Sequence, residues 1–206
     1  MNELHMLHTA FKAYDIRGII PDELNEELVY RIGRAYATLY NPKTICVGYD
    51  IRQSSVSLCH ALCKGLTDGG VDVYNIGLVG TEMVYFTTFY YRLDGGIMIT
   101  ASHNPKEYNG FKSYRADGAQ MIDEETEAIK RHIRAAVDGI EILANSESFE
   151  ELVKAGDIKY FGREIDDSYN AMIMDYFNSS SVSRRARASL RIVYSPLNGS
   201  GREPVR

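Results

Sequence analysis

The fold of this chain is decided by the stretch Gly95-Gly96-Ile97-Met98-Ile99-Thr100-Ala101-Ser102-His103-Asn104-Pro105. Its apolar centre, which follows two glycines, is typical of a buried strand. Pro105 and the nearby Asn109-Gly110 pair predict that regular structure stops directly after that strand. Ser102 is therefore expected at the C-terminal end of a strand. Ligands of open α/β sheets bind at that edge, which makes this serine a candidate functional residue.

Helix and strand patterns alternate before this stretch. Residues 24–39 and 58–66 carry apolar side chains at helical spacing. Residues 44–48 and 71–76 are apolar runs typical of buried strands, and a helix over residues 81–91 leads to the strand that begins at Gly96. Such alternation predicts an α/β fold, in which a mainly parallel mixed sheet is sandwiched by helices.

The rest of the chain is predicted to complete one domain and to begin another. Between residues 139 and 162 the pattern loosens into a connection with one short helix, so we place a domain boundary near residue 155. Residues 1–155 then form the first domain, and residues 156–206 form the incomplete beginning of a second, similar α/β domain. The further expected elements are a structured loop over 11–18, a strand over 111–114, helices over 123–136 and 166–177, a polar turn over 184–191, a strand over 190–194 and a turn over 195–201.

Composition and charge argue against several classes of function. The net charge is −5 and the single arginine-rich stretch, residues 184–191, does not make a nucleic-acid-binding surface. No segment has the apolar length that crosses a membrane, and residues 1–5 lack a signal-peptide pattern, so we expect a cytoplasmic protein. Nucleotide-binding glycine spacings are absent from the sequence. A phosphate site stays compatible with this charge, because it needs only local positive potential.

The cysteines allow two interpretations. Cys59 and Cys63 share a helix face with His60 between them, which is a spacing that could bind a metal ion. Buried reduced thiols are the favoured interpretation, since the chain has three cysteines, with apolar neighbours and no further Cys-x-x-Cys pair.

Asp50 and Arg52 follow the strand over residues 44–48 and are expected at the same sheet edge as Ser102. They are candidates for supporting the serine loop. The favoured alternative is structural: the two side chains pair with each other, or cap the next helix together with Ser54 or Ser55.

The string Thr100-Ala101-Ser102-His103-Asn104-Pro105, followed by Tyr108-Asn109-Gly110-Phe111-Lys112, resembles the active-site serine motif of the α-D-phosphohexomutases, the family of phosphomannomutase and phosphoglucomutase. The string Tyr14-Asp15-Ile16-Arg17-Gly18 is similar to the N-terminal segment of phosphomannomutases. The resemblance covers nearly the whole chain, although family members are longer and are built from four α/β domains around a central cleft.

This resemblance implies an enzyme that interconverts hexose 6-phosphate and hexose 1-phosphate through a phosphoserine and a hexose 1,6-bisphosphate. Mannose 6-phosphate is the first expected substrate and glucose 6-phosphate the second. The roles implied for single residues are phosphate donor and acceptor for Ser102, phosphate contact or proton transfer for His103 and Lys112, charge stabilisation for Arg17, approach to the serine and the substrate phosphate for Tyr14, and shaping of the loop for Asn104.

The implied cofactors are Mg²⁺, bound through the phosphate on Ser102, and hexose 1,6-bisphosphate as phosphate donor. The remaining metal ligands, the sugar-recognition loop and the loop that grips the sugar phosphate are expected beyond Arg206. The expected partner is a phosphosugar, with neither nucleic acid nor membrane, and the oligomeric state is left open. This chain alone is predicted to fold its first domain and to show little or no mutase turnover.

Two other functions are compatible with parts of this sequence. A non-catalytic module that binds phosphosugars or a partner protein would use Ser102 only as a regulatory phosphorylation site. A serine hydrolase would use Ser102 with His103, but the chain lacks a Gly-x-Ser-x-Gly elbow, and neighbouring residues do not form the usual geometry of nucleophile and base.

Overall fold

One mixed sheet organises the part of the chain that the structure describes. This computed structural model describes residues 9–11, 16–136, 147–178, 183–197, 199–202 and 205. Within these residues the strand order is β1-β5-β4-β2-β3-β6. The strands are β1 Ile16–Ile19, β2 Thr44–Tyr49, β3 Asp72–Leu78, β4 Gly95–Ile99, β5 Tyr108–Arg115 and β6 Ile158–Tyr160. The helices are α2 Glu26–Tyr40, α3 Ser55–Thr67, α4 Thr81–Tyr90, α5 Asp123–Ala136, α6 Phe149–Ala155, α7 Arg163–Asn178 and α8 Arg184–Ala188, with a 3-10 helix η1 Ser200–Arg202.

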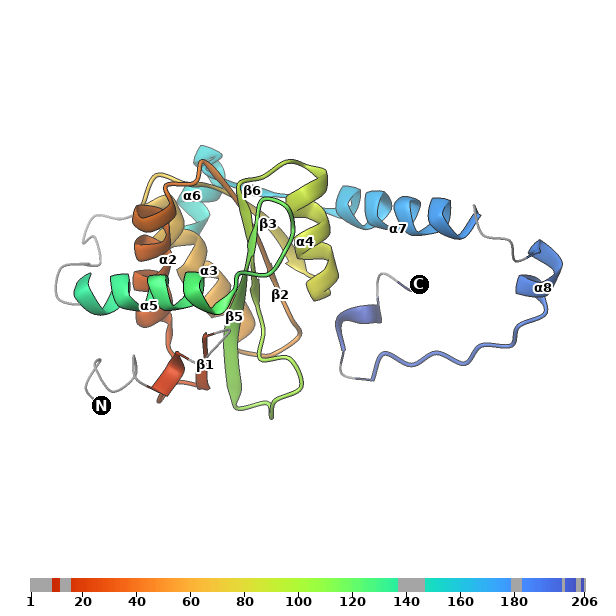
Figure 1. Ribbon diagram of the computed structural model, residues 1–206, viewed down its shortest axis with the longest axis horizontal. Coiled ribbons are helices and arrows are strands. Elements are labelled where there is room, and N and C mark those ends of the chain that lie inside the picture. Colours follow the sequence, from red (N-terminus) through yellow and green to blue (C-terminus); the bar gives the residue numbers. More distant parts are fainter. Residues whose placement is uncertain are drawn as a thin grey trace.

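Strand direction confirms the expected mainly parallel sheet. Strands β4, β2, β3 and β6 are parallel to one another, whereas β5 is antiparallel to both β4 and β1. The central strand β4 is buried along its whole length, as its apolar run predicts. Helices α2, α3 and α5 cover one face of the sheet, and α4 covers the other (Figure 1). The predicted α/β fold is therefore confirmed.

The start of β5 and the strand β1 correct two sequence predictions. Asn109 and Gly110 do not end the regular structure but lie inside β5, and residues 16–18 form a strand rather than a loop. The two segments pair with each other, with Arg17 opposite Gly110. A Cβ on residue 110 would overlap the carbonyl oxygen of Ile16, so glycine is required there by the close approach of two strands and not by a turn.

Buried hydrogen bonds explain why asparagine is tolerated in this strand. The Asn109 side chain is fully buried, and its Nδ2 donates to Ser54 Oγ at 2.9 Å and to Ser55 Oγ at 3.0 Å. Its Oδ1 accepts from the backbone N–H of Gly110 at 2.8 Å. A polar side chain with several partners can be buried at little cost, so this asparagine joins β5 to the N-terminal end of α3.

The C-terminal part contains two confirmed helices and three corrections. The expected helix over residues 166–177 is α7, and the short helix expected between residues 139 and 162 is α6. Strand β6, which pairs with β3, was not predicted. Its three residues are too few to show a pattern. The arginine-rich residues form α8 rather than a turn, and residues 190–194 are not a strand.

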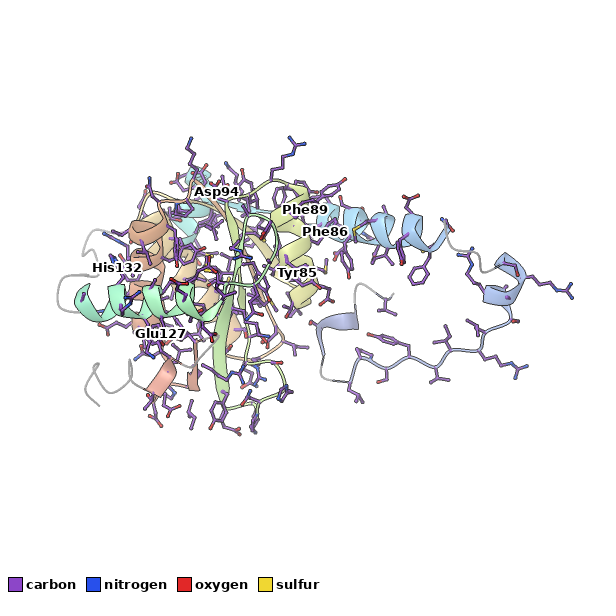
Figure 2. All side chains as sticks on the ribbon, in the orientation of Figure 1. Tyr85, Phe86, Phe89, Asp94, Glu127 and His132 are labelled. Carbon is purple, nitrogen blue, oxygen red and sulfur yellow. The ribbon has the colours of Figure 1, made fainter. Side chains whose placement is uncertain are left out.

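Residues 190–194 lack a partner strand among the described residues, and a strand needs hydrogen-bonded neighbours. Figure 1 shows α7 leading away from the sheet and α8 lying far from it. The contact between α4 and α7 is aromatic, because Phe86 packs edge to face on Tyr169 with ring centroids 5.3 Å apart. Figure 2 labels Phe86 on α4, beside the start of α7. The proposed domain boundary near residue 155 stays a prediction.

The three cysteines confirm the thiol interpretation. Cys46, Cys59 and Cys63 are free and buried. Burial raises the pKa of Cys46 and of Cys63, which keeps both thiols neutral. His60 is half-buried and stacks on Phe149 of α6, with ring centroids 3.7 Å apart. Within the described ranges, no group of three or more His, Cys, Asp or Glu side chains could hold a metal ion. No described helix is both long and apolar enough to span a membrane.

Candidate active site

Ser102 lies in the loop that joins β4 to β5, at the C-terminal end of β4. Its side chain is exposed, whereas the preceding Ala101 is fully buried and anchors the loop to the core. The backbone of Ser102 has a φ of 54°, in the left-handed region that L-residues rarely adopt. Backbone of this kind occurs at functional sites when the surroundings impose it.

Hydrogen bonds that lead to Asp50, at the end of β2, hold the Ser102 backbone in this conformation. The backbone N–H of Ser102 donates to Thr100 Oγ1 at 2.9 Å, and Thr100 Oγ1 donates to Asp50 Oδ2 at 2.8 Å. Asp50 also accepts from Ser55 Oγ, in the first turn of α3, at 2.7 Å. The carboxylate of Asp50 therefore links the serine loop to the adjacent helix.

Arg52 holds the same loop through its carbonyl oxygens. Its Nη1 donates to the carbonyl oxygens of Pro105 and Tyr108 at 2.7 and 3.0 Å, and its Nη2 to those of Ser102 and Asn104 at 2.9 and 2.8 Å. Its Nε donates to Asp50 Oδ2 at 3.2 Å. The expected Asp50–Arg52 pair is present. The two residues also hold the serine loop, which is the less favoured of the two roles expected from the sequence.

Asn104 and His103 occupy different positions around the serine. The Asn104 side chain donates to the carbonyl oxygen of Ala101 at 2.9 Å, which closes the loop on itself. The His103 ring is exposed, and its Nδ1 lies 3.4 Å from Ser102 Oγ. That distance is long for a hydrogen bond involving a hydroxyl group.

Strand register brings Arg17 and Lys112 to one face of the sheet. Lys112 lies directly opposite Met98 of β4, and Arg17 lies opposite Gly110, two residues before Lys112 on β5. Since side chains alternate along a strand, Arg17, Lys112 and Met98 point to the same face. Met98 lines the cavity onto which Ser102 opens. Tyr14 lies outside the described residues.

A cavity of about 860 Å³ adjoins the serine loop. Both signs of charge line it, and its polar side chains include Asp50, Arg52, Glu82, Thr100, Ser102 and Lys106. Pockets for drug-sized ligands span about 300–1,000 Å³, so a cavity of this volume has room for a ligand of the size of a hexose monophosphate. The serine hydroxyl therefore faces a space that can hold a phosphorylated sugar.

The described residues do not by themselves fit a magnesium site. A phosphate on Ser102 would supply oxygen ligands, but a Mg²⁺ site also uses one or two carboxylates at close range. In the part of the chain that is described, no cluster of such groups is found, and Asp50 is occupied by Arg52, Thr100 and Ser55.

The sequence does not predict the network of hydrogen bonds that holds the Ser102 loop. In the sequence Thr100 stands out only as part of a motif, and the Asn109-Gly110 pair predicts a turn. Their spacing from Asp50 and Ser54 is about fifty residues along the chain, at 50 and 55 positions respectively, so no local pattern could reveal these hydrogen bonds. The only usable signal is that Asp50 and Thr100 each lie within two residues of the end of a predicted parallel strand.

Comparison with known proteins supplies the remaining observation. Residues 8–138 match the family described as phosphoglucomutase/phosphomannomutase, alpha/beta/alpha domain I. The chain belongs to the phosphoglucomutase/phosphomannomutase family. The matched residues include β1, β5 and the loop that carries Ser102, so the candidate active site lies in the part of the chain that matches domain I.

Relatives agree with this assignment. A phosphomannomutase of Salmonella typhimurium is 40% identical over 192 residues, which cover 93% of this chain and 39% of that protein. A phosphomannomutase of Klebsiella pneumoniae is 55% identical over 118 residues, covering 57% of this chain and 74% of that sequence. A crystal structure of a phosphoglucomutase/phosphomannomutase family protein from Burkholderia thailandensis has a TM-score of 0.65 at 31% identity, covering 81% of this chain and 35% of that one. The chain thus spans about two fifths of the length of the Salmonella relative.

Proposed function

We propose that this chain is the serine-bearing part of a phosphohexomutase, in which Ser102 stores the transferable phosphate. The observation that carries the proposal is the geometry of one loop. An exposed serine sits on left-handed backbone at the C-terminal edge of the sheet, above an Asp50–Arg52 support, and opens onto a cavity large enough for a hexose phosphate. Membership of the phosphoglucomutase/phosphomannomutase family gives the class of reaction.

The reaction would proceed in two transfers. In the first, the bond between Ser102 Oγ and phosphorus breaks and a bond forms between phosphorus and a free hydroxyl oxygen of a hexose monophosphate. The proton of that hydroxyl leaves to a base, and the released Ser102 Oγ takes up a proton. The product is a hexose 1,6-bisphosphate. In the second transfer the Ser102 hydroxyl gives up its proton to the base, its Oγ forms a bond to the other phosphorus, and the bond from that phosphorus to the sugar oxygen breaks. The sugar oxygen takes up a proton, which leaves a monophosphate with its phosphate moved between C6 and C1.

Roles for neighbouring residues follow from charge and position. Arg17 and Lys112 lie on the sheet face that includes Met98, so their positive charges would offset the negative charge of the transferring phosphate. His103, whose Nδ1 is 3.4 Å from Ser102 Oγ, would contact phosphate or move a proton. Asn104 would keep the loop closed, and Tyr14 stays a predicted phosphate contact.

The proposal also names a substrate and cofactors, which membership of the family alone does not specify. Mannose 6-phosphate is the first substrate and glucose 6-phosphate the second, in line with the names of the Salmonella and Klebsiella relatives. Mg²⁺ would bind an oxygen of the phosphoserine and lower the charge on the transferring group, with its other ligands predicted beyond Arg206. Hexose 1,6-bisphosphate would load the serine with phosphate. Cytoplasmic localisation stays a prediction, and the oligomeric state stays open.

The first test is to load the serine. The chain is incubated with glucose 1,6-bisphosphate and Mg²⁺, and its intact mass is measured. We expect the mass of one added phosphate, mapped to Ser102 by peptide sequencing and lost in Ser102→Ala. The matched control is Ser200→Ala, because Ser200 lines the same cavity and should not affect the phosphate gain.

Failure to gain phosphate would contradict the proposal. If, in addition, mannose 6-phosphate bound to both wild type and Ser102→Ala with equal affinity, the chain would be a non-catalytic phosphosugar-binding module. A separate assay of mannose phosphate interconversion is expected to show little or no turnover by this chain alone. Turnover at about 1–1,000 s⁻¹, the range of ordinary enzymes, would show that prediction to be wrong.

A further inference from the structure

The Arg52 side chain has no donor left for a ligand. A guanidinium group carries five N–H donors, and those of Arg52 reach the carbonyl oxygens of Ser102, Asn104, Pro105 and Tyr108 and the carboxylate of Asp50. Only 11% of the Arg52 side-chain surface is exposed, and 15% of that of Asp50. Although Arg52 lines the cavity, its hydrogen bonds all point to the protein.

The carbonyl oxygens that Arg52 binds belong to both arms of the serine loop. Those of Ser102 and Asn104 follow β4, and those of Pro105 and Tyr108 lead into β5. One rigid planar group therefore fixes the separation of the two arms. The exposed Ser102, on the arm that follows β4, keeps its left-handed φ of 54° while its N–H donates to Thr100 Oγ1.

Each part of this support starts from the end of β2. Asp50 accepts from the backbone N–H and the Nε of Arg52 and from Thr100 Oγ1, so the carboxylate holds both the guanidinium and the threonine that binds Ser102 N–H. The Asp50 backbone N–H in turn donates to the carbonyl oxygen of Ile99, the last residue of β4, at 3.0 Å. The position of Ser102 Oγ is thereby tied to β2 through two routes.

From this geometry we propose that Arg52 is a positioning residue for phosphoryl transfer: it fixes the loop so that Ser102 Oγ is held in place for transfer to and from the sugar. This inference rests on the proposed function. Arg52 touches neither the sugar nor the phosphate, so it acts through the loop. Its loss should lower the rate of transfer and leave the affinity for the phosphosugar unchanged, because no ligand contact is removed.

The experiment measures phosphate gain at Ser102 over time at several concentrations of glucose 1,6-bisphosphate. Variants are Arg52→Ala, Arg52→Lys and, as matched control, Arg115→Ala. Arg115 also belongs to a charged group, lying 3.6 Å from Asp117 and from Glu125, but it is paired with Gly95 at the opposite end of β4. Circular dichroism and thermal unfolding are recorded for every variant.

We expect Arg52→Ala to lower the rate constant at saturating bisphosphate by roughly 100-fold, the loss that a displacement of about 1 Å causes. The bisphosphate concentration for half-maximal rate should stay at the wild-type value. Arg52→Lys should give an intermediate rate, because an ammonium group has three donors and no planar fork. Millimolar guanidinium chloride should restore part of the Arg52→Ala rate, whereas equal sodium chloride should not.

The other outcomes overturn the inference in distinguishable ways. If wild type gains phosphate and folded Arg52→Ala gains it at the same rate, Arg52 does not position the loop and the proposed function stands. An unchanged rate with a higher half-maximal concentration would make Arg52 a ligand contact instead. If both Arg52 variants are unfolded while Arg115→Ala is folded, Arg52 is a folding residue. If wild type gains no phosphate at all, the proposed function fails and the positioning role fails with it.

Discussion

Two largely apolar runs in this chain, both typical of strands in sequence, have different structures. Gly96–Ile99 and Leu190–Tyr194 were both predicted to be strands. The first is β4, buried between β2 and β5. In the second, Ile192 is 79% exposed and Val193 fully exposed, and no described strand lies beside them. An apolar run therefore forms a strand only when neighbouring strands complete its hydrogen bonds and helices cover its faces.

The largest effect that tests this comparison is expected from one truncation in each run. Ile97→Ala should lower the free energy of unfolding by about 2–5 kcal/mol, because it leaves a cavity in the core of the sheet. Ile192→Ala should change it by less than about 0.5 kcal/mol, since that side chain is exposed. Urea unfolding measures both variants. Equal losses would mean that residues 190–194 are packed, and the contrast between the runs would disappear.

A smaller effect is expected from adding a methyl group rather than removing side-chain atoms. Gly110→Ala should cost about 1–3 kcal/mol, because the new Cβ overlaps the backbone of β1 and something has to shift. The matched control is Gly162→Ala, just before α7, where the nearest atom to a Cβ is Glu164 Oε2 at 3.4 Å, the end of a flexible side chain. Thermal unfolding should show no loss for the control. Unchanged stability of Gly110→Ala would contradict the close pairing of β1 with β5.

The smallest effect is a pH dependence of the free energy of unfolding, which arises at His60 on helix α3. Burial lowers the pKa of His60, where the ring stacks on Phe149. On acidification the unfolded chain therefore takes up this proton before the folded one. The stability that neutral His60 contributes is present above about pH 6.5, the unfolded pKa, and is lost as the pH falls through the lower folded pKa.

His60→Phe keeps an aromatic ring against Phe149 and removes the titration. We expect wild type to lose more unfolding free energy between pH 7 and pH 5 than His60→Phe does, as measured by urea unfolding at each pH. Identical pH profiles would show that the folded environment does not disfavour the His60 cation.

Much of the fold could be predicted because its patterns are local. The apolar spacing of α2 and α3 and the runs of β2, β3 and β4 were enough to predict a mainly parallel sheet with helices on both faces. The antiparallel side was missed in part, since residues 16–18 and 109–110 become strands by pairing with each other across more than ninety positions. Glycine and asparagine have low strand propensity, so local pattern pointed the wrong way.

The candidate site divides in the same manner. Ser102, with its place at a strand end, could be predicted from the run that precedes it. The pairing of Asp50 with Arg52 could also be predicted, because two positions separate them in sequence. The four carbonyl contacts of Arg52 could not, since carbonyl oxygens belong to the backbone and leave no signal in the residue types of Pro105 or Tyr108.

The return of the chain from β4 into antiparallel β5 has a consequence for how a reaction with two transfers could run. Thr100 N–H donates to the carbonyl oxygen of Gly110 at 2.8 Å, so the loop that carries Ser102 is closed by a hydrogen bond between its two ends. A loop held at both ends in this way cannot swing outward as a lid does. In the proposed reaction a phosphate carried by Ser102 would stay in place, and the sugar would have to turn around in the cavity to present its other end.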